Sequence, residues 1–190
     1  MKTDIILSGV GGQGILSIAT VIGDAALNEG MHLKQAEVHG MSQRGGDVQS
    51  NLRISTKPIH SDLIPLGSAN VIISLEPMEA LRYMPYLAPN GWVITSSKTF
   101  VNIPNYPAQM DLDSALAEIR NLVMFDVAEL AEKNGMPRAE NMILLGAAVE
   151  AVGLPLEKIL DSVKRIFSSK GEAVVEQNIK AVMLGYEAKK

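Results

Sequence analysis

The stretch Gly9-Val10-Gly11-Gly12-Gln13-Gly14 decides the fold of this 190-residue chain. It follows the short apolar run 5–7 and precedes a segment with helical apolar spacing that begins at Ile15, so it predicts a glycine turn between a first strand and a first helix. Its spacing matches G-x-G-x-x-G in the context that this pattern requires. A helix N-terminus at such a turn offers N–H groups and a partial positive charge to an anion. The alternative is a turn that only lets the helix pack closely on the sheet. The candidate binding residues here are Gly9, Gly11, Gly12, Gln13 and Gly14.

Strands and helices alternate along the rest of the chain, which predicts an α/β fold: a Rossmann-like, open, mostly parallel sheet with helices on both faces and a helical C-terminal tail. We expect one domain over 1–190, with an α/β core of about 1–135 and a helical tail of about 138–188. Because sequential strands are usually neighbours, the first two strands are expected side by side. The expected strands are 3–9, 32–38, 47–55, 71–75, 92–95 and 122–125, and the first helix is expected over 13–29.

Two segments of this predicted fold have residue patterns that suggest contact with solvent, a ligand or another subunit. The strand 47–55 alternates strictly, with Gln49, Asn51, Arg53 and Ser55 on one side and mostly apolar residues on the other. A strand buried on both faces reads as a continuous apolar run, so we expect this one at the sheet edge or with a face toward solvent or another subunit. The segment 100–110 contains two prolines and no clear period, which predicts a long loop that serves a partner or a site.

A second polar block follows the strand 32–38. Glu37 stands near the distance at which a dinucleotide-binding fold places its ribose-binding acid. Arg44 can present a planar fork to a phosphate or carboxylate, and the glycines after it let backbone N–H groups turn toward the same point. The alternatives are a solvated surface turn and a subunit contact. The candidate binding residues of this block are Glu37, Ser42, Gln43, Arg44, Gly45 and Gly46.

Composition excludes several classes of function. The chain has no cysteine, so it cannot form disulfides, thiolate zinc sites or cysteine-ligated iron–sulfur clusters. Its three histidines, His32, His39 and His60, lack metal-ligand spacing, and no nucleophile stands beside His39 in a known pattern. A formal net charge of −4 and only 4% aromatic residues argue against nucleic-acid binding. No apolar run is long enough to span a bilayer, and we expect a soluble, cytoplasmic protein.

Three blocks taken together resemble a known family. They are G-x-G-G-Q-G at 9–14, Glu-Val-His-Gly-Met-Ser-Gln-Arg-Gly-Gly at 37–46, and Glu-Pro-Met-Glu-Ala-Leu-Arg at 76–82. In this combination the chain resembles the gamma-type domain of the 2-oxoacid:ferredoxin oxidoreductases, from Met1 to about Leu184. Within that family it is most similar to the small (beta) subunits of the indolepyruvate type.

The resemblance implies a reaction that this chain does not catalyse alone. Such complexes oxidatively decarboxylate arylpyruvates to aryl-acetyl-CoA and CO₂ and reduce ferredoxin. The large alpha subunit is expected to hold thiamine diphosphate, Mg and the [4Fe-4S] clusters, while CoA, another anion or nothing lies at the glycine turn. Three alternatives stay open: a gamma subunit of another 2-oxoacid:ferredoxin oxidoreductase, a purely structural subunit, and a free-standing Rossmann-type NAD- or FAD-binding protein, for which 190 residues leave no substrate domain.

Overall fold

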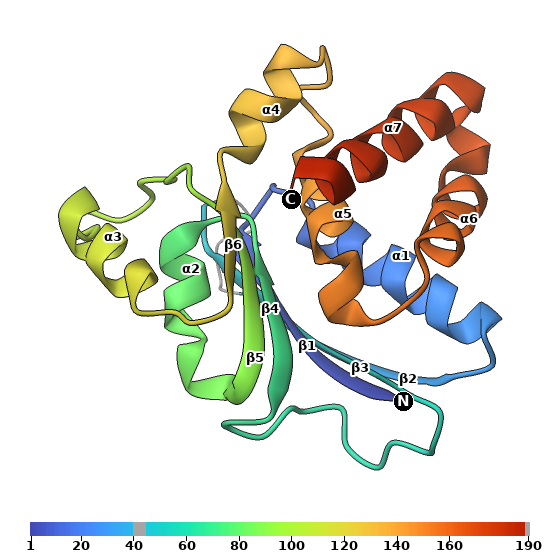
Figure 1. Cartoon of the computed structure of the whole chain (residues 1–190), viewed down its shortest axis with the longest axis horizontal. Helices are drawn as coiled ribbons and strands as arrows, with labels where there is room; N and C mark the ends of the chain where they lie inside the picture. Colours follow the sequence, from blue (N-terminus) through green and yellow to red (C-terminus); the bar gives the residue numbers. More distant parts are fainter. Residues whose placement is uncertain (40–44, 189–190) are drawn as a thin grey trace.

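A single sheet forms the centre of the computed structural model, which describes residues 1–39 and 45–188 (Figure 1). Within those residues six strands pair in the order β2-β3-β1-β4-β5-β6. Only β3 runs against the others, since it is antiparallel to both β1 and β2, while β1, β4, β5 and β6 pair in parallel. The predicted α/β class with a mostly parallel sheet is therefore confirmed. The strands are β1 Lys2–Val10, β2 His32–His39, β3 Asp47–Ser55, β4 Ala69–Ser74, β5 Leu87–Ser96 and β6 Leu122–Phe125.

The expected pairing of the first two strands is wrong. β2 and β3 form an antiparallel hairpin, and β3 is the strand of that hairpin that pairs with β1. Neighbouring strands lie about 4.8 Å apart, so β2 is two strand spacings away from β1, at the edge of the sheet. The rule for sequential strands fails because the hairpin joins the sheet by its second strand.

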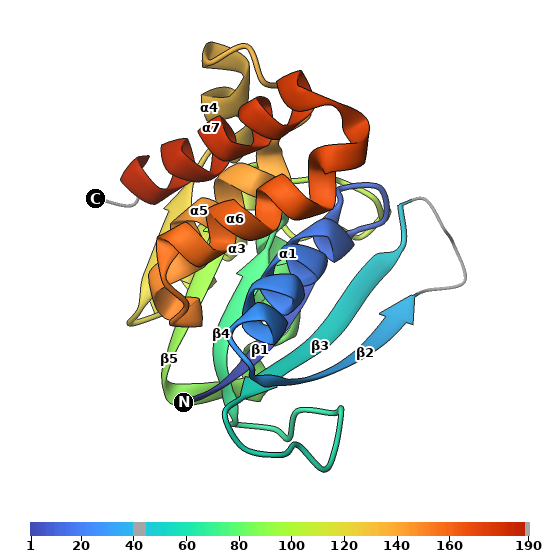
Figure 2. The same ribbon diagram turned by 90° about the vertical axis from the view of Figure 1, so that its right-hand side faces the viewer.

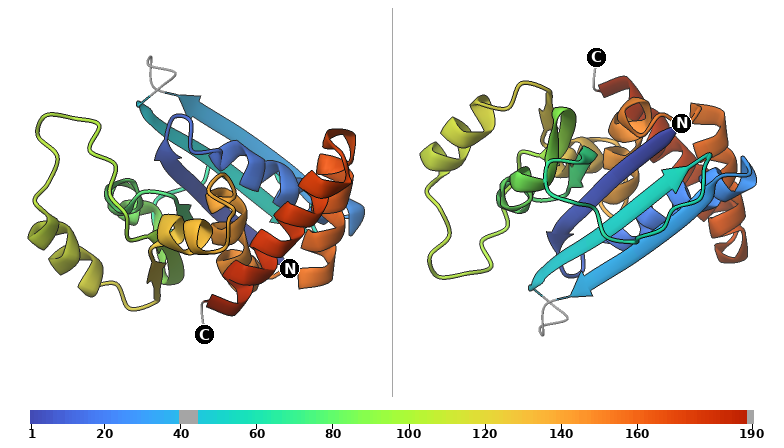
Figure 3. Two further views of the ribbon diagram at one scale, coloured as in Figure 1. Left: turned by 90° about the horizontal axis from the view of Figure 1, so that it is seen from above. Right: turned by 90° about the horizontal axis from the view of Figure 1, so that it is seen from below.

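Helices cover both faces of the sheet. On one face lie α1 (Ile15–Asn28), α5 (Glu140–Val152), α6 (Leu156–Phe167) and α7 (Glu172–Ala188), which Figures 1 and 2 show together on one side. The shorter α2 (Pro77–Arg82) and α3 (Gln109–Ala117) lie on the opposite face, as Figure 3 shows from above and below. The helix α4 (Val127–Lys133) follows β6 at its carboxyl end. Among the described residues no helix is both long and apolar enough to cross a membrane.

The helix α5 is buried on nearly all its sides, because it packs on the sheet, on α1 and on α7. Its crossing with α7 depends on two glycines. A Cβ on Gly146 would lie 2.0 Å from the carbonyl oxygen of Val182, and one on Gly185 would lie 1.7 Å from that of Ile143. The two helix backbones therefore touch, and the helical tail belongs to the same hydrophobic core as the sheet.

The polar side of β3 is not at the surface, which corrects the expectation of an edge or solvent-facing strand. Arg53 donates hydrogen bonds from Nε and Nη2 to the two carboxylate oxygens of Asp4 on β1, at 2.8 and 3.2 Å. Its Nη1 also donates to two backbone carbonyls of the segment 56–68, which covers this face. Asn51 accepts a hydrogen bond from the Ile64 amide of the same segment at 3.2 Å. Partners within the chain therefore satisfy Arg53 and Asn51, and neither residue needs a second subunit.

The proline-containing loop is present, over 97–108 instead of the predicted 100–110, because α3 begins at Gln109. Residues 97–108, which we call the strap, contain no regular helix or strand and run from β5 to α3. The sequence pattern did not predict α3 itself, because this helix buries only Leu112 and Leu116 and has little amphipathic character. The strap and α3 project from the rest of the sheet, as the left panel of Figure 3 shows.

Candidate functional site

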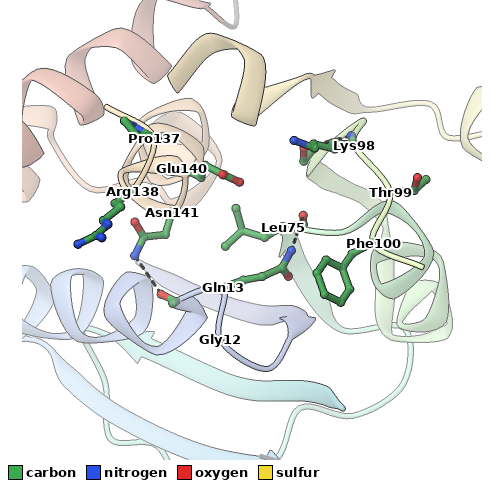
Figure 4. A pocket seen from close by; sticks show the side chains of 12 residues that line it. Gly12, Gln13, Leu75, Lys98, Thr99, Phe100, Pro137, Arg138, Glu140 and Asn141 are labelled. Carbon is green, nitrogen blue, oxygen red and sulfur yellow. Dashed lines mark hydrogen bonds between the residues drawn. The ribbon is translucent and has the colours of Figure 1, made fainter. Parts of the chain in front are cut away.

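A cleft of about 660 Å³ opens beyond the carboxyl ends of β1, β4 and β5 (Figure 4). The helix after β1 lies on one face of the sheet and the helix after β4 on the other, so the cleft stands where the direction of winding changes. In open α/β sheets this switch point is where ligands bind. The residues that line it come from the glycine turn, the strap and the start of α5: Gly12, Gln13, Gly14, Leu75, Ser96, Lys98, Thr99, Phe100, Pro137, Arg138, Glu140 and Asn141.

The structure gives a reason for glycine at three positions of the turn. Gly12 and Gly14 have φ angles of 105° and 80°, in the left-handed region that side chains disfavour. Gly14 also faces α5, where a Cβ would lie 2.7 Å from Nδ2 of Asn141. That Nδ2 donates to the carbonyl of Gly14 at 3.2 Å. A Cβ on Gly9 would lie 2.8 Å from Oε1 of Gln13. Packing and backbone geometry thus explain Gly9, Gly12 and Gly14 even before any ligand is considered.

Gln13 ties the turn together. Its Oε1 accepts from the amide of Val10 at 2.7 Å, and its Nε2 donates to the carbonyl of Leu75 at 3.4 Å. The side chain therefore links the end of β1 to the end of β4 at the cleft, as Figure 4 shows for the second bond. One backbone donor of the turn is consumed by this arrangement. It makes the turn more rigid and less available to a pyrophosphate than the spacing of the glycines suggests.

The described end of the second glycine-containing segment, Gly45 and Gly46, lies beside the glycine turn. The amide of Gly11 donates to the carbonyl of Gly46 at 2.8 Å, because β3 begins directly opposite the end of β1. The carbonyl of Gly45 accepts from Nδ2 of Asn102, also at 2.8 Å, so the strap reaches the same point. The predicted site residues Ser42, Gln43 and Arg44 lie outside the described residues.

Glu37 is not brought to the cleft. It lies on β2, with β3 between it and β1, and opposite Ser50 in the register. Its carboxylate accepts from Nε2 of Gln35 at 2.7 Å on the exposed edge of the sheet. A ribose-binding acid stands at the end of a strand adjacent to the glycine turn in dinucleotide folds. The arrangement in this chain therefore disfavours that interpretation of Glu37.

Two positively charged residues that the sequence patterns did not single out line the cleft. Lys98 belongs to the strap and Arg138 to the connection between α4 and α5, and Figure 4 shows them on opposite sides. Both side chains are exposed, and neither forms an ion pair with another described residue. No local motif marks either position, because 40 residues of chain separate them and only the fold brings them to one site.

One acid shares the cleft with these cations. Glu140 lies at the start of α5, and its burial raises the pKa of the carboxyl above the ordinary value, although Lys98 opposes that rise. Asp126 and Glu132 add to it through like charge. With the first turn of α1 also facing the cleft, the surroundings favour a negatively charged ligand. Within the described ranges no group of three histidine or acidic side chains is placed to hold a metal ion.

The third sequence block lies behind the strap. Glu76 precedes α2, and its Oε2 accepts from the amide of Glu79 at 2.8 Å, so its side chain caps the start of this helix. Glu79 is itself fully buried and receives two hydrogen bonds from Arg82, at 2.9 and 3.2 Å. Burial nevertheless raises the pKa of the Glu79 carboxyl. Both acids therefore have structural partners.

Comparison with known proteins agrees with the sequence blocks. A family model described as pyruvate ferredoxin/flavodoxin oxidoreductase matches residues 4–188. The chain is 34% identical to the indolepyruvate oxidoreductase subunit IorB of Archaeoglobus fulgidus, over 98% of this chain and 94% of that protein. It is 36% identical to subunit IorB of Pyrococcus horikoshii, over 98% of this chain and 96% of that one.

A solved structure has the same fold. This is the 2-oxoglutarate:ferredoxin oxidoreductase from Magnetococcus marinus with 2-oxoglutarate, coenzyme A and succinyl-CoA bound, which superposes with a TM-score of 0.75 at 17% identity. The match covers 99% of the present chain, which spans 31% of that protein's length. The likeness at this identity shows the fold alone. The predicted α/β architecture and the resemblance stated from the sequence are both confirmed by these comparisons.

Proposed function

This chain belongs to the pyruvate ferredoxin/flavodoxin oxidoreductase family, and from that premise we propose that it is the small subunit of an indolepyruvate:ferredoxin oxidoreductase. The observation that carries the proposal is identity of 34 and 36% over nearly the whole length of two proteins named as indolepyruvate oxidoreductase subunits. The complex would decarboxylate an arylpyruvate oxidatively, form aryl-acetyl-CoA and CO₂, and reduce ferredoxin. A cytoplasmic location is part of the same proposal.

The chemistry of the electron carriers belongs to the large alpha subunit in this proposal. That subunit would hold thiamine diphosphate, Mg and the [4Fe-4S] clusters, because this chain offers no cysteine to ligate a cluster. The present chain would complete the complex rather than catalyse by itself.

We propose that CoA binds in the cleft at the glycine turn. Lys98 and Arg138 would hold its phosphates from two sides, and the first turn of α1 would add backbone N–H donors. CoA supplies the thiol that takes up the acyl group. The later part of the second block, Ser42 to Gly46 with Arg44, would contribute at the far side of the turn, where Gly46 contacts Gly11.

The strap and α3 supply the surface that we assign to the large subunit. Phe100, Val101 and Met110 are exposed apolar side chains, and the last two are 71 and 76% exposed. Exposed apolar groups gathered on one projecting segment indicate a protein interface. The segment also borders the cleft, so the same contact would place the cleft at the junction between subunits.

A free-standing NAD- or FAD-binding protein is the second candidate, and two observations disfavour it. The amides of Val10 and Gly11, which a pyrophosphate would need, already donate to Gln13 and Gly46. Glu37 lies two strands from β1 rather than one. The glycine spacing alone supports this candidate.

The proposal is tested by purifying the chain alone and with a large subunit encoded beside it. The isolated chain is expected to be colourless and to show no dye reduction with indolepyruvate. The complex is expected to show cluster absorbance and to reduce ferredoxin only with indolepyruvate and CoA present. Titration of the isolated chain with NADH and FAD is the control, and tight binding of either would favour the second candidate. Dye reduction by the isolated chain would overturn the proposal.

A further inference from the structure

The carboxylate of Glu76 does more than cap a helix. The residue is 0% exposed, and its two oxygens accept from three donors. Oε2 accepts from the Glu79 amide, within its own helix. Oε1 accepts from the amide of Phe100 at 3.3 Å and from the hydroxyl of Tyr106, and both of these donors belong to the strap. One oxygen therefore serves α2 and the other holds two points of the strap, 24 and 30 residues farther along the chain.

The first of these two points ends the cleft-lining part of the strap, and the second lies beyond the contact of the strap with the glycine loop that precedes β3. The amide of Phe100 donates a hydrogen bond to Glu76. The side chain of Phe100 lines the cleft, and Figure 4 shows it next to Gln13. Lys98 lies two residues before it. Between Phe100 and Tyr106, Asn102 donates to the carbonyl of Gly45. A movement of the strap away from Glu76 would thus displace the Lys98 side of the cleft and the Asn102 contact together.

The strap has few other attachments. Among the described residues the other hydrogen bonds of its backbone are local or lie at its ends. The amides of Ser97, Lys98 and Tyr106 donate to the Phe125 carbonyl, the Ser96 hydroxyl and the Ile103 carbonyl, and the Ala108 carbonyl accepts from the first turn of α3. Hydrogen bonds to a buried carboxylate contribute more to stability than bonds between neutral groups. Tyr106 is also partly buried, and both burial and its bond to Glu76 raise the pKa of its hydroxyl, so the hydroxyl stays a donor at neutral pH.

We propose that Glu76 and Tyr106 are positioning residues. Their hydrogen bond, which we call the clasp, holds the strap at one side of the cleft and thereby fixes the positions of Lys98 and Phe100 for an anionic ligand. Neither residue lines the cleft itself. They act through the strap, one from behind it and one from within it. The proposal rests on the proposed function for the ligand, taken as CoA, while the clasp is a property of this chain alone.

The experiment compares Tyr106→Phe with Tyr86→Phe. The first variant removes one hydroxyl from Glu76, and the second removes a hydroxyl for which the described residues show no hydrogen bond. Amide hydrogen exchange over 97–108 is measured on each full-length chain. We expect exchange in Tyr106→Phe to be about 10-fold faster in the strap, as the loss of one charge-assisted hydrogen bond allows, and unchanged in α5. Tyr86→Phe is expected to match the wild type in the strap.

The functional arm uses the reconstituted complex. For Tyr106→Phe we expect the KM for CoA to rise several-fold, roughly 3- to 10-fold, with kcat unchanged and the melting temperature lowered by no more than about 4 °C. Glu76→Gln keeps an acceptor for Tyr106 without the charge, and it should fall between the wild type and Tyr106→Phe in both measurements.

Unchanged exchange in the strap would overturn the clasp, whatever the complex does. Faster exchange with an unchanged KM for CoA would overturn the positioning role. If the wild-type complex showed no dependence on CoA, the proposed function would fail, and the exchange measurement would still decide whether Glu76 and Tyr106 hold the strap.

Discussion

Arg53 and Asp4 form a buried, two-pronged ion pair between β3 and β1, with N–O distances of 2.8 and 3.2 Å. The side chain of Asp4 is 1% exposed and that of Arg53 is 10% exposed. Both also have further partners, because Lys2 lies 2.8 Å from Asp4 and Arg53 donates to two carbonyls of the 56–68 segment. This pair holds the 56–68 segment against the strands. Because groups of the same chain accept the hydrogen bonds of Arg53, this residue of the polar face of β3 needs no partner subunit.

Removing one member of this pair should be costly. Arg53→Ala leaves the Asp4 carboxylate buried with only Lys2 as a charged partner and frees two carbonyls, so we expect the free energy of unfolding to fall by about 3 kcal/mol. Urea unfolding followed by circular dichroism measures it. Arg165→Ala is the matched control, because its pair with Asp24 lies at the surface and should contribute less than about 1 kcal/mol. Equal losses in the two variants would contradict the importance of burial.

The proposed contact of the strap with a large subunit predicts a surface variant that weakens assembly without a stability defect. Val101→Asp puts a charge on an exposed apolar position of the strap, so it should weaken assembly by roughly 10-fold or more, because an apolar contact is replaced by a desolvated charge. Leu66→Asp is the control: Leu66 is 67% exposed, close to the 71% of Val101, but lies on the segment that covers β3. Binding of each variant to the large subunit is measured by titration. The interface is misplaced if Leu66→Asp weakens binding and Val101→Asp does not.

Two glycines of the turn should respond differently to substitution. In Gly12→Ala the added Cβ has no atom within 4 Å, so only the positive φ of this position should destabilise the protein, by about 1 kcal/mol. Gly14→Ala adds the displacement of Asn141 and the loss of its hydrogen bond, so we expect a total of about 2 kcal/mol. Thermal and urea unfolding measure both. In an Asn141→Ala background the difference between the two glycine variants should shrink, and a difference that persisted there would show that Asn141 is not its cause.

The raised pKa of Glu140 predicts a pH dependence. The unfolded carboxyl ionises near its ordinary pKa of 4.5, whereas the folded one ionises at higher pH. Between the two the folded protein binds more protons than the unfolded one, so the stability that this group contributes decreases as the pH rises through that window. Glu140→Gln should therefore gain stability relative to the wild type between pH 4 and pH 7, by less than about 1 kcal/mol because the group is partly exposed. Urea unfolding at both pH values checks this, and an equal difference at the two would contradict it.

Local patterns predicted the elements of this fold well, and the reason is visible in particular residues. The strands Asp47–Ser55 and Leu122–Phe125 have the predicted bounds, since alternation and apolar runs are properties of neighbouring residues. The order of the strands was not predictable in this way. It depends on which strand of the β2–β3 hairpin reaches β1, and the Arg53 to Asp4 pair that supports this order joins residues 49 apart in the sequence.

The same distinction applies to the candidate site. The glycine turn is a local motif, and it was predicted with its position at the end of β1. The other polar residues of the cleft come from loops and a helix start far along the chain: Lys98, Arg138 and Asn141. Their residue types are common on protein surfaces, so nothing in the local sequence marks them. Glu37 shows the opposite case, because its spacing matches a motif while the topology moves it to the edge strand.

Arg44 provides the last prediction. The residue lies outside the described part of the chain, but Gly46 accepts a hydrogen bond from Gly11 and Gly45 accepts one from Asn102, so the end of its loop lies beside the glycine turn and the strap. This contact arises through the start of β3 and not through pairing of the first two strands. We expect Arg44→Ala to raise the KM for CoA or weaken assembly of the complex by about 1–3 kcal/mol, as the loss of a charged hydrogen bond does, with folding unchanged.

Arg44→Lys separates charge from geometry at this position. The lysine keeps the positive charge and loses the planar fork, so its effect should be smaller than that of Arg44→Ala and still measurable. Kinetics and assembly of the reconstituted complex are compared with thermal unfolding of each variant, and Lys57→Ala serves as a control because Lys57 lies at the opposite end of β3, beyond Ser55. If Arg44→Ala changed neither the KM for CoA, nor kcat, nor assembly, the loop would be an ordinary surface turn and the anionic ligand would depend on Lys98 and Arg138 alone.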